Sequence, residues 1–181
     1  MPAYEISIVN RQRAVPIDRR TLRSLARATL AMEGVSSAEI SVAFVSDAEI
    51  HEINRNFLNH DFPTDVISFL LEGDGTDLAG AAGTVRRGAN RVLDGEIVIS
   101  TETAAHNASR HQTTTSHELA LYLVHGLLHL CGYDDLTPRE KRLMRRREAE
   151  ALLLLDVPAP KRAPARNAPR SRPAKRKARR Q

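Results

Sequence analysis

The sequence predicts a single domain of the α+β class, in which a small mixed four-stranded sheet packs with about five helices. The chain has 181 residues, which suffice for one domain and are too few for two ordinary ones. Hydrophobic residues make up 41% of it, enough for a sizeable core. Segments with a two-residue apolar period alternate with segments whose apolar residues recur every three to four positions, which is typical of a mixed fold.

Short apolar or alternating segments predict the four strands. At the start of the chain, Ile6 and Ile8 alternate with polar residues, so one face of this strand is expected to be buried. The stretch 72–90 is rich in Gly and Ala and is expected to form a loop or an irregular hairpin. The predicted strands are residues 4–9, 39–45, 66–71 and 96–100.

Apolar residues at helical spacing predict the five helices. Ser46 and Glu49 have the pattern of a capping box at the start of the second helix. The fourth helix is the most apolar and is expected to end at Gly132, and Pro138 favours the start of the fifth. The predicted helices are residues 17–32, 46–57, 101–110, 115–130 and 137–155.

Charge divides the chain into a body, residues 1–156, and a tail, residues 157–181. The tail holds ten of the 27 Lys and Arg and none of the 22 Asp and Glu, which leaves the body with 17 basic against 22 acidic residues. Five prolines and no large apolar residue predict a disordered tail. Such a tail is expected to attract RNA, the alternative being a solubilising extension without a specific partner. The tail residues expected to contact RNA are Lys161, Arg162, Lys175, Arg176, Lys177, Arg179 and Arg180.

Several classes of protein are disfavoured by composition. No apolar stretch reaches the roughly 18–20 residues of a membrane span and no secretory signal is visible, so a cytoplasmic protein without membrane contact is expected. The single cysteine, Cys131, excludes an internal disulfide framework and is interpreted as a core residue rather than a ligand. Three Tyr, four Phe and no Trp argue against a surface that stacks many bases.

Residues that carry chemistry gather near the end of the fourth predicted helix. His125 and His129 are four residues apart, so they share one helix face with Cβ atoms about 5–6 Å apart. Two imidazoles placed in this way can bind one divalent ion, and a turn at Gly132 would bring Asp135 to the same ion. Two His with one carboxylate leave a coordination position open for water, as catalytic zinc requires, so the fourth helix is expected to be a zincin-like metal helix. Glu118, on the same stripe, is predicted to accept a ring N–H from one of the ligands.

Two other interpretations of this segment compete with a catalytic zinc site. The two histidines could be core residues with satisfied hydrogen bonds. A zinc protease is the second interpretation, but Gly126 stands where the helical protease signature has its glutamate base, which disfavours peptide hydrolysis.

Three blocks of the sequence point to one family. The first is His-Gly-Leu-Leu-His-Leu-Cys-Gly-Tyr-Asp at 125–134, the second Pro-Thr-Asp-Val-Ile-Ser-Phe at 63–69 with Asn54 and Asp61 upstream, and the third Gly-Glu-Ile-Val-Ile at 95–99. In order and spacing, over about residues 39–148, they resemble the YbeY family of bacterial metal-dependent endoribonucleases. The resemblance implies a zinc ion in a cleft and cleavage of single-stranded RNA. It also implies 3′-end maturation of 16S ribosomal RNA and ribosome quality control, with the small ribosomal subunit, a ribosomal protein and a ribosome-associated GTPase as partners.

The chain departs from the pattern of that family at three positions. Asp135 stands where the family usually has a histidine ligand, and aspartate is also a competent zinc ligand. Leu58 stands where the family usually has an arginine, and Arg55, one turn earlier, is hypothesised to replace it. Glu96 replaces an aspartate and keeps its charge.

The proton acceptor of the reaction is left open by the sequence, as is the choice between water and the ribose 2′-hydroxyl as nucleophile. Asp65 and Glu96 are candidates by position, although a turn residue and a strand-edge charge are equally good interpretations. His60 and His111 are weaker candidates for phosphate contacts, since surface histidines are common. The remaining alternatives are a non-catalytic ribosome-associated factor that keeps its zinc and a plain RNA-binding protein.

Overall fold

Four strands form one mixed sheet, and five helices pack with it, in the computed structural model, which describes residues 2–73 and 87–155. The predicted α+β class is therefore confirmed. The tail and most of the predicted loop 72–90 lie outside the described residues. The strands are β1 (Ala3–Asn10), β2 (Ser37–Val45), β3 (Val66–Gly73) and β4 (Val92–Ser100), and the helices are α1 (Arg19–Glu33), α2 (Asp47–Leu58), α3 (Thr101–His111), α4 (Thr115–Leu130) and α5 (Pro138–Leu153).

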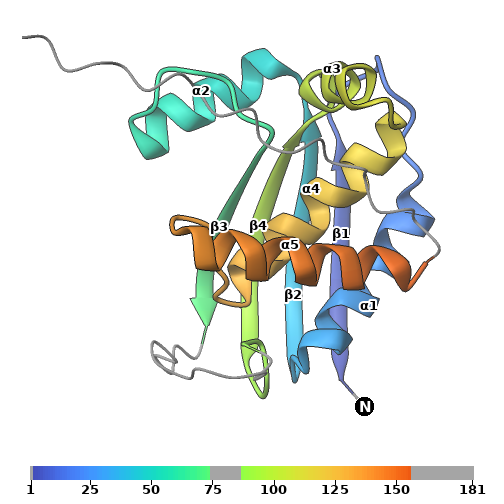
Figure 1. Ribbon diagram of the computed structural model, residues 1–181. Helices are drawn as coiled ribbons and strands as arrows, with labels where there is room; N and C mark the ends of the chain where they lie inside the picture. The colour runs from blue at the N-terminus through green and yellow to red at the C-terminus, as the bar shows by residue number, and fades with distance from the viewer. Residues whose placement is uncertain (1, 74–86, 156–181) are drawn as a thin grey trace, which may run out of the picture.

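The strand order in the sheet is β1-β2-β4-β3. Strand β2 pairs parallel with β1 and with β4, whereas β3 lies antiparallel on the outer side of β4. Helices α1 and α4 cover one face of the sheet, and α5 crosses α4 on the side away from the strands (Figure 1). Helix α2 packs against β3 and β4 near one end of the sheet. No helix in the described part of the chain is long and apolar enough to cross a membrane.

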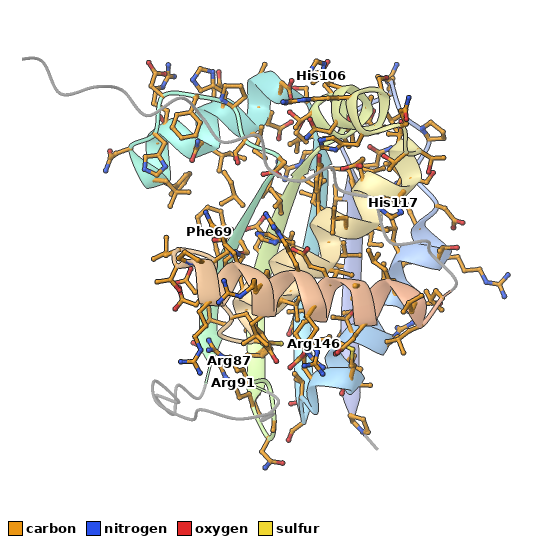
Figure 2. All side chains as sticks on the ribbon, viewed as in Figure 1. Phe69, Arg87, Arg91, His106, His117 and Arg146 are labelled. Atoms are coloured by element: carbon orange, nitrogen blue, oxygen red, sulfur yellow. The ribbon has the colours of Figure 1, made fainter. Side chains whose placement is uncertain are left out.

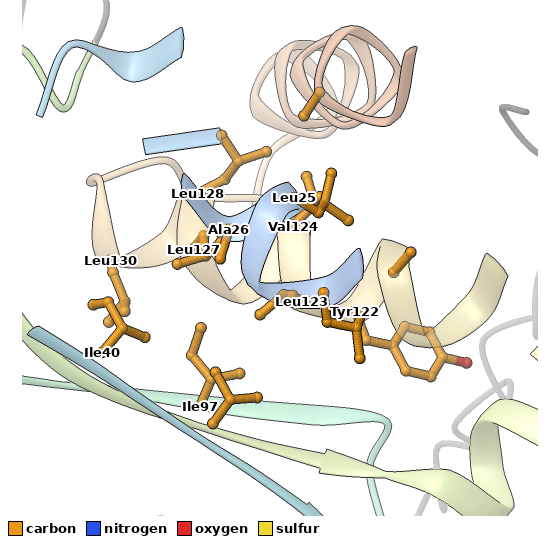
Figure 3. Close-up of a cluster of buried hydrophobic side chains, with 14 of the residues drawn as sticks. Leu25, Ala26, Ile40, Ile97, Tyr122, Leu123, Val124, Leu127, Leu128 and Leu130 are labelled. Atoms are coloured by element: carbon orange, nitrogen blue, oxygen red, sulfur yellow. The ribbon is translucent and has the colours of Figure 1, made fainter. Parts of the chain in front are cut away.

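The main core lies between the sheet and the layer formed by α1 and α4. Ile40 of β2 and Ile97 of β4 face Leu127 of α4, which also packs under α1 (Figure 3). Because α4 is covered by the sheet, α1 and α5, it is apolar on nearly its whole circumference, as its sequence predicted. Cys131 is buried in this core, and burial beside Glu33 raises the pKa of its thiol to about 12, so it is an unreactive packing residue.

Strand β4 begins earlier than predicted and contains a glycine. The prediction started this strand at residue 96, but the ladder with β2 runs from Val92. A Cβ atom at residue 95 would lie 2.8 Å from Cδ1 of Leu130 and 3.1 Å from the backbone oxygen of Phe69, so glycine lets the end of α4 lie close to the sheet without a shift of these groups.

A full capping box forms at α5 rather than at α2, where it was predicted. The Ser46 hydroxyl does accept the Glu49 N–H of α2, at 3.3 Å. The Glu49 carboxylate, however, binds Arg11 instead of returning to residue 46. At α5 both halves are present, because Thr137 and Glu140 bond each other's backbone N–H.

Candidate active site

His125 and His129 lie on successive turns of α4, and the structure brings their rings together. Their Nε2 atoms are 3.0 Å apart, with ring centroids 4.5 Å apart and ring planes 80° to each other. This is the shared helix face that the four-residue spacing predicted.

The Nδ1 atoms of both rings are held by other groups. Nδ1 of His125 lies 2.7 Å from Oε1 of Glu148, a buried carboxylate on α5. Nδ1 of His129 lies 3.0 Å from the backbone oxygen of Tyr133. Because a carbonyl oxygen and a carboxylate accept hydrogen bonds, each Nδ1 carries the proton, and the lone pair of each neutral ring is on Nε2.

Two nitrogen lone pairs facing each other at 3.0 Å repel unless a positive charge lies between them. Burial favours the neutral form of His125, but the hydrogen bond and charge of Glu148 outweigh it and raise the pKa of this ring. Burial and the neighbouring charge of His125 lower the pKa of His129. The pair is therefore built to hold one positive charge.

A zinc ion fits this pair of donors. Zn–N bonds of about 2.0–2.1 Å at tetrahedral angles place two nitrogens about 3.3 Å apart, close to the observed separation. The third predicted donor, Asp135, is near enough for its negative charge to favour the protonated form of both rings, although burial and the charge of His125 outweigh it at His129, whose pKa stays lowered. Its carboxylate is not assembled with them, since within residues 2–73 and 87–155 no three His, Cys, Asp or Glu side chains are grouped closely enough to hold a metal.

The turn after α4 returns the chain to His129. Gly132 has a φ of +93°, in the left-handed region that favours glycine, and the following residue is Tyr133, whose oxygen binds the ring. Arg91 donates to the Leu130 oxygen at 3.2 Å and Arg87 to the Gly132 oxygen at 2.7 Å. Figure 2 shows both arginines together near the start of β4. These cations satisfy carbonyls at the C-terminal end of α4 and stabilise the turn.

Tyr133 is also fixed through its side chain. Its hydroxyl donates to Oε2 of the fully buried Glu33 of α1 at 2.9 Å. Oε1 of Glu33 accepts two bonds from Arg147 of α5, at 2.6 and 2.9 Å. Adjacent residues of α5 thus orient both histidines, Glu148 directly and Arg147 through Glu33 and Tyr133.

The histidine pair lines a cavity of about 470 Å³. This volume is within the range of small-molecule and substrate sites. Three segments form its wall: the end of α2 with the loop that follows, the first half of β3, and the last turns of α4. No Lys or Arg of the described chain is among the lining residues, which are Asn54, Leu58, His60, Phe62, Thr64, Asp65, Val66, Ile67, Ser68, Leu70, His125, Gly126, His129 and Leu130.

Of the two carboxylates predicted as proton acceptors, only Asp65 lines the cavity. Its charge raises the pKa of His125, and its Oδ1 accepts from the Val66 N–H and the Thr64 hydroxyl. Glu96 lies on the opposite face of the sheet, because its neighbour Ile97 faces α4 and successive strand residues alternate in direction. Glu96 therefore does not reach the histidine pair.

Glu118 is not the partner of either ring, contrary to the prediction. It is buried near the start of α4 and accepts from the Thr113 hydroxyl at 2.6 Å, with His111 at 3.8 Å. Seven residues of helix span about 10 Å, so a side chain on the same stripe is too far away. The sequence did contain a signal for the actual partner, since Glu148 lies on the stripe of α5 that buries Met144 and Leu152.

The remaining candidates divide between the cavity wall and the surface. Leu58 and His60 line the cavity, whereas Arg55 is exposed and is not part of the wall, so the structure does not bring it to the position that Leu58 occupies. Gly126 packs on β4, where a Cβ atom would lie 3.0 Å from Cγ2 of Ile97. A glutamate base at this position would be directed into the sheet, which counts against a protease.

Comparisons with known proteins identify the family of this chain. The family model described as "Endoribonuclease YbeY" matches residues 7–156. A protein of that name from Rhodopirellula baltica is 40% identical over 78% of this chain and 66% of its own length, and one from Moorella thermoacetica is 41% identical over 82% and 95%. The solution structure of TM1509 from Thermotoga maritima has the same fold, with a TM-score of 0.53, 24% identity, and coverage of 82% of this chain and 90% of that one. The chain belongs to the YbeY family of endoribonucleases.

Proposed function

We propose that this protein is a zinc-dependent endoribonuclease that cleaves single-stranded RNA in the cavity beside α4. The proposed substrate is the 3′ end of 16S ribosomal RNA in the cytoplasm, with a part in ribosome quality control. The observation that carries the proposal is the pair of Nε2 atoms 3.0 Å apart on the cavity wall, with both Nδ1 atoms held by Glu148 and Tyr133.

His125 and His129 would hold the zinc ion in this proposal, and the Asp135 carboxylate would have to turn toward them to become the third ligand. When bound, the ion supplies a Lewis acid for a phosphodiester oxygen or lowers the pKa of a water molecule. Glu148 and the Tyr133 carbonyl keep the two rings in the tautomer that presents Nε2. Asp65 is the proposed proton acceptor, because it is the carboxylate on the cavity wall and would take a proton from water or from a 2′-hydroxyl.

Elemental analysis and an RNA cleavage assay test the proposal together. About one zinc ion per chain and cleavage of single-stranded but not duplex RNA are expected for the native protein, with both lost in His129→Ala. The matched control is His106→Ala, because this exposed histidine of α3 (Figure 2) is not one of the residues that line the cavity. Native protein that cleaves RNA equally well with a chelator present, or a His129→Ala variant that keeps full activity, would overturn the proposal.

One observation favours a second function, a non-catalytic ribosome-associated factor that keeps its zinc. Leu58 lines the cavity where the family resemblance implies an arginine, and none of the described lining residues is a Lys or Arg. This function predicts that His129→Ala abolishes zinc binding but leaves binding to the small ribosomal subunit intact. Measuring the two properties on the same variant separates the functions.

A further inference from the structure

We propose that Phe62, stacked on His60 at the rim of the cavity, is a binding site for one unpaired nucleobase of the RNA strand. This inference rests on the proposed function, since it names a group of the same substrate. It concerns a side chain that neither the metal chemistry nor the proton transfer uses.

The ring of Phe62, stacked on the ring of His60, forms an aromatic platform on the cavity wall that also holds the histidine pair. The ring centroids of His60 and Phe62 are 5.4 Å apart and the planes are only 13° from parallel. Both residues line the cavity, and 55% of the surface of Phe62 is exposed. An exposed aromatic face next to a reaction centre is the feature that binds unstacked bases, because every base has a π face that stacks on it.

The platform is held in place by a buried polar residue. Asn54 of α2 is only 2% exposed, and its Nδ2 donates to the backbone oxygen of Phe62 at 2.7 Å. Its own backbone oxygen accepts the N–H of His60, and the adjacent Asp61 binds His51 of α2 at 2.9 Å. The loop is therefore fixed while its aromatic side chain stays exposed, which reduces the entropy lost on binding.

Charge gives a second reason for contacts with bases. RNA strands are normally held through phosphates by Lys and Arg. The cavity wall offers no such side chain in the described chain, and Asp65 makes it more negative. A strand that enters this cavity meets no Lys or Arg side chain of the described chain there, so contacts of another kind must add to its affinity, and the platform supplies one.

Phe57, the exposed phenylalanine near the end of α2, provides a matched control. It is 71% exposed, more than Phe62, but it packs edge-on against Phe69 of β3, with centroids 6.0 Å apart and planes at 67°. It is not part of the cavity wall. If exposure alone attracted bases, Phe57 would contribute as much as Phe62.

The test measures the affinity of the zinc-loaded protein for two 2′-O-methyl hexanucleotides. One hexanucleotide carries bases, and the other has only abasic sugars. Both hexanucleotides are checked after the titration to make sure that they have not been cleaved. We expect Phe62→Ala to weaken binding of the first between about fivefold and a hundredfold and to leave binding of the second unchanged. Phe62→Trp should keep the affinity, Phe62→Leu should lose it because it has no π face, and Phe57→Ala should behave as the native protein. The slope of affinity against salt should not change, because no phosphate contact is removed.

Several outcomes would overturn the inference. One is that Phe62→Ala or Phe62→Leu binds the hexanucleotide with bases as tightly as the native protein does. Another is that Phe57→Ala loses as much affinity for it as Phe62→Ala does. The third is that Phe62→Ala loses as much affinity for the abasic strand as for the strand with bases. Cleavage of unmodified RNA, measured in parallel, separates this inference from the proposed function. Base-dependent binding through Phe62 without any cleavage would refute the nuclease and leave the platform, whereas cleavage with unaltered binding in Phe62→Ala would refute the platform alone.

Discussion

At the scale of single residues, the site depends on which nitrogen of each histidine is free. Glu148 and the Tyr133 carbonyl both occupy Nδ1, so both rings present Nε2 to the same point. If either hydrogen bond were broken, that ring could rotate or change tautomer, and the two lone pairs would no longer converge. The orientation of the donors therefore comes from residues that do not touch the ion themselves.

Replacing Glu148 by glutamine should weaken zinc binding about 10- to 100-fold, because the neutral side chain no longer holds the protonated Nδ1 of His125 as strongly. Competition with a chromophoric chelator measures the affinity. Glu150→Gln is the control, since this carboxylate of the same helix is more exposed and pairs with Arg146 and Arg147. Equal affinities for the two variants would contradict the role of Glu148.

At the scale of the elements, α5 is an outer helix that reaches the core through one ion pair. Arg147 has a side chain only 17% exposed and binds Glu33, whose side chain is fully buried. The neighbouring pair of Arg146 and Glu150 lies on the surface, with the arginine 69% exposed (Figure 2). Burial increases the cost of separating two charges, so only the first pair is expected to matter for stability.

Arg147→Met should lower the free energy of unfolding by about 3–5 kcal/mol, because it leaves the Glu33 carboxylate buried without its cation. Arg146→Met should change it by less than about 1 kcal/mol. Urea denaturation followed by circular dichroism compares the two. A similar loss of unfolding free energy in both variants would show that the buried pair stabilises the fold no more than the surface pair does.

The start of α1 gives a prediction for pH. The carboxylate of Asp18 accepts from the Thr21 hydroxyl and from the N–H groups of Thr21 and Arg20, which lowers its pKa below the usual 3.8. A group whose pKa is lower in the folded state stabilises the fold above its unfolded pKa, and this stabilisation is lost as the pH falls through the folded value.

Asp18→Asn keeps a capping side chain but cannot titrate. The native protein should therefore melt at a higher temperature than this variant near neutral pH, and the difference should disappear as the pH falls through the lowered pKa of Asp18. Thermal unfolding at a series of pH values measures it. A difference that persists unchanged into strong acid would exclude titration of Asp18 as its cause.

At the scale of the whole molecule, the charges are divided between faces. Glu5, Glu39, Asp94 and Glu72 pair across the four strands and form one row, on the side of the sheet opposite α4. The cavity lies on the α4 side of β3. The acidic row repels an RNA strand, whereas the ten Lys and Arg residues of the tail and the six of α5 attract it.

Removal of residues 157–181 should weaken binding of single-stranded RNA at low salt and leave cleavage at saturating RNA unchanged. The slope of log affinity against log salt should become shallower by about 0.7 for each phosphate that the tail neutralises in the full chain. Fluorescence anisotropy over a range of salt concentrations gives both the affinity and the slope. An unchanged slope would favour the alternative, in which the tail is a solubilising extension.

Local periodicity in the sequence is sufficient to predict those features that depend only on residues close together in the chain. Residues four apart on a helix must share a face, so the pairing of His125 and His129 could be predicted from spacing alone. The turn at Gly132 and the alternation of strands and helices follow in the same way. The capping box was placed wrongly because Ser46 and Glu49 have the pattern, but Arg11 competes for the glutamate.

The sequence by itself determined the family, the fold class and the two histidines that define the site. Only the tertiary structure decided that Glu148, 23 residues after His125, holds its ring, that Glu118 does not, and that Glu96 faces away. It also decided that Phe62 lines the cavity while Phe57 does not. The physical reason is that these relations depend on how helices cross and on which sheet face a strand presents to them, and both are set by packing between segments far apart in the chain.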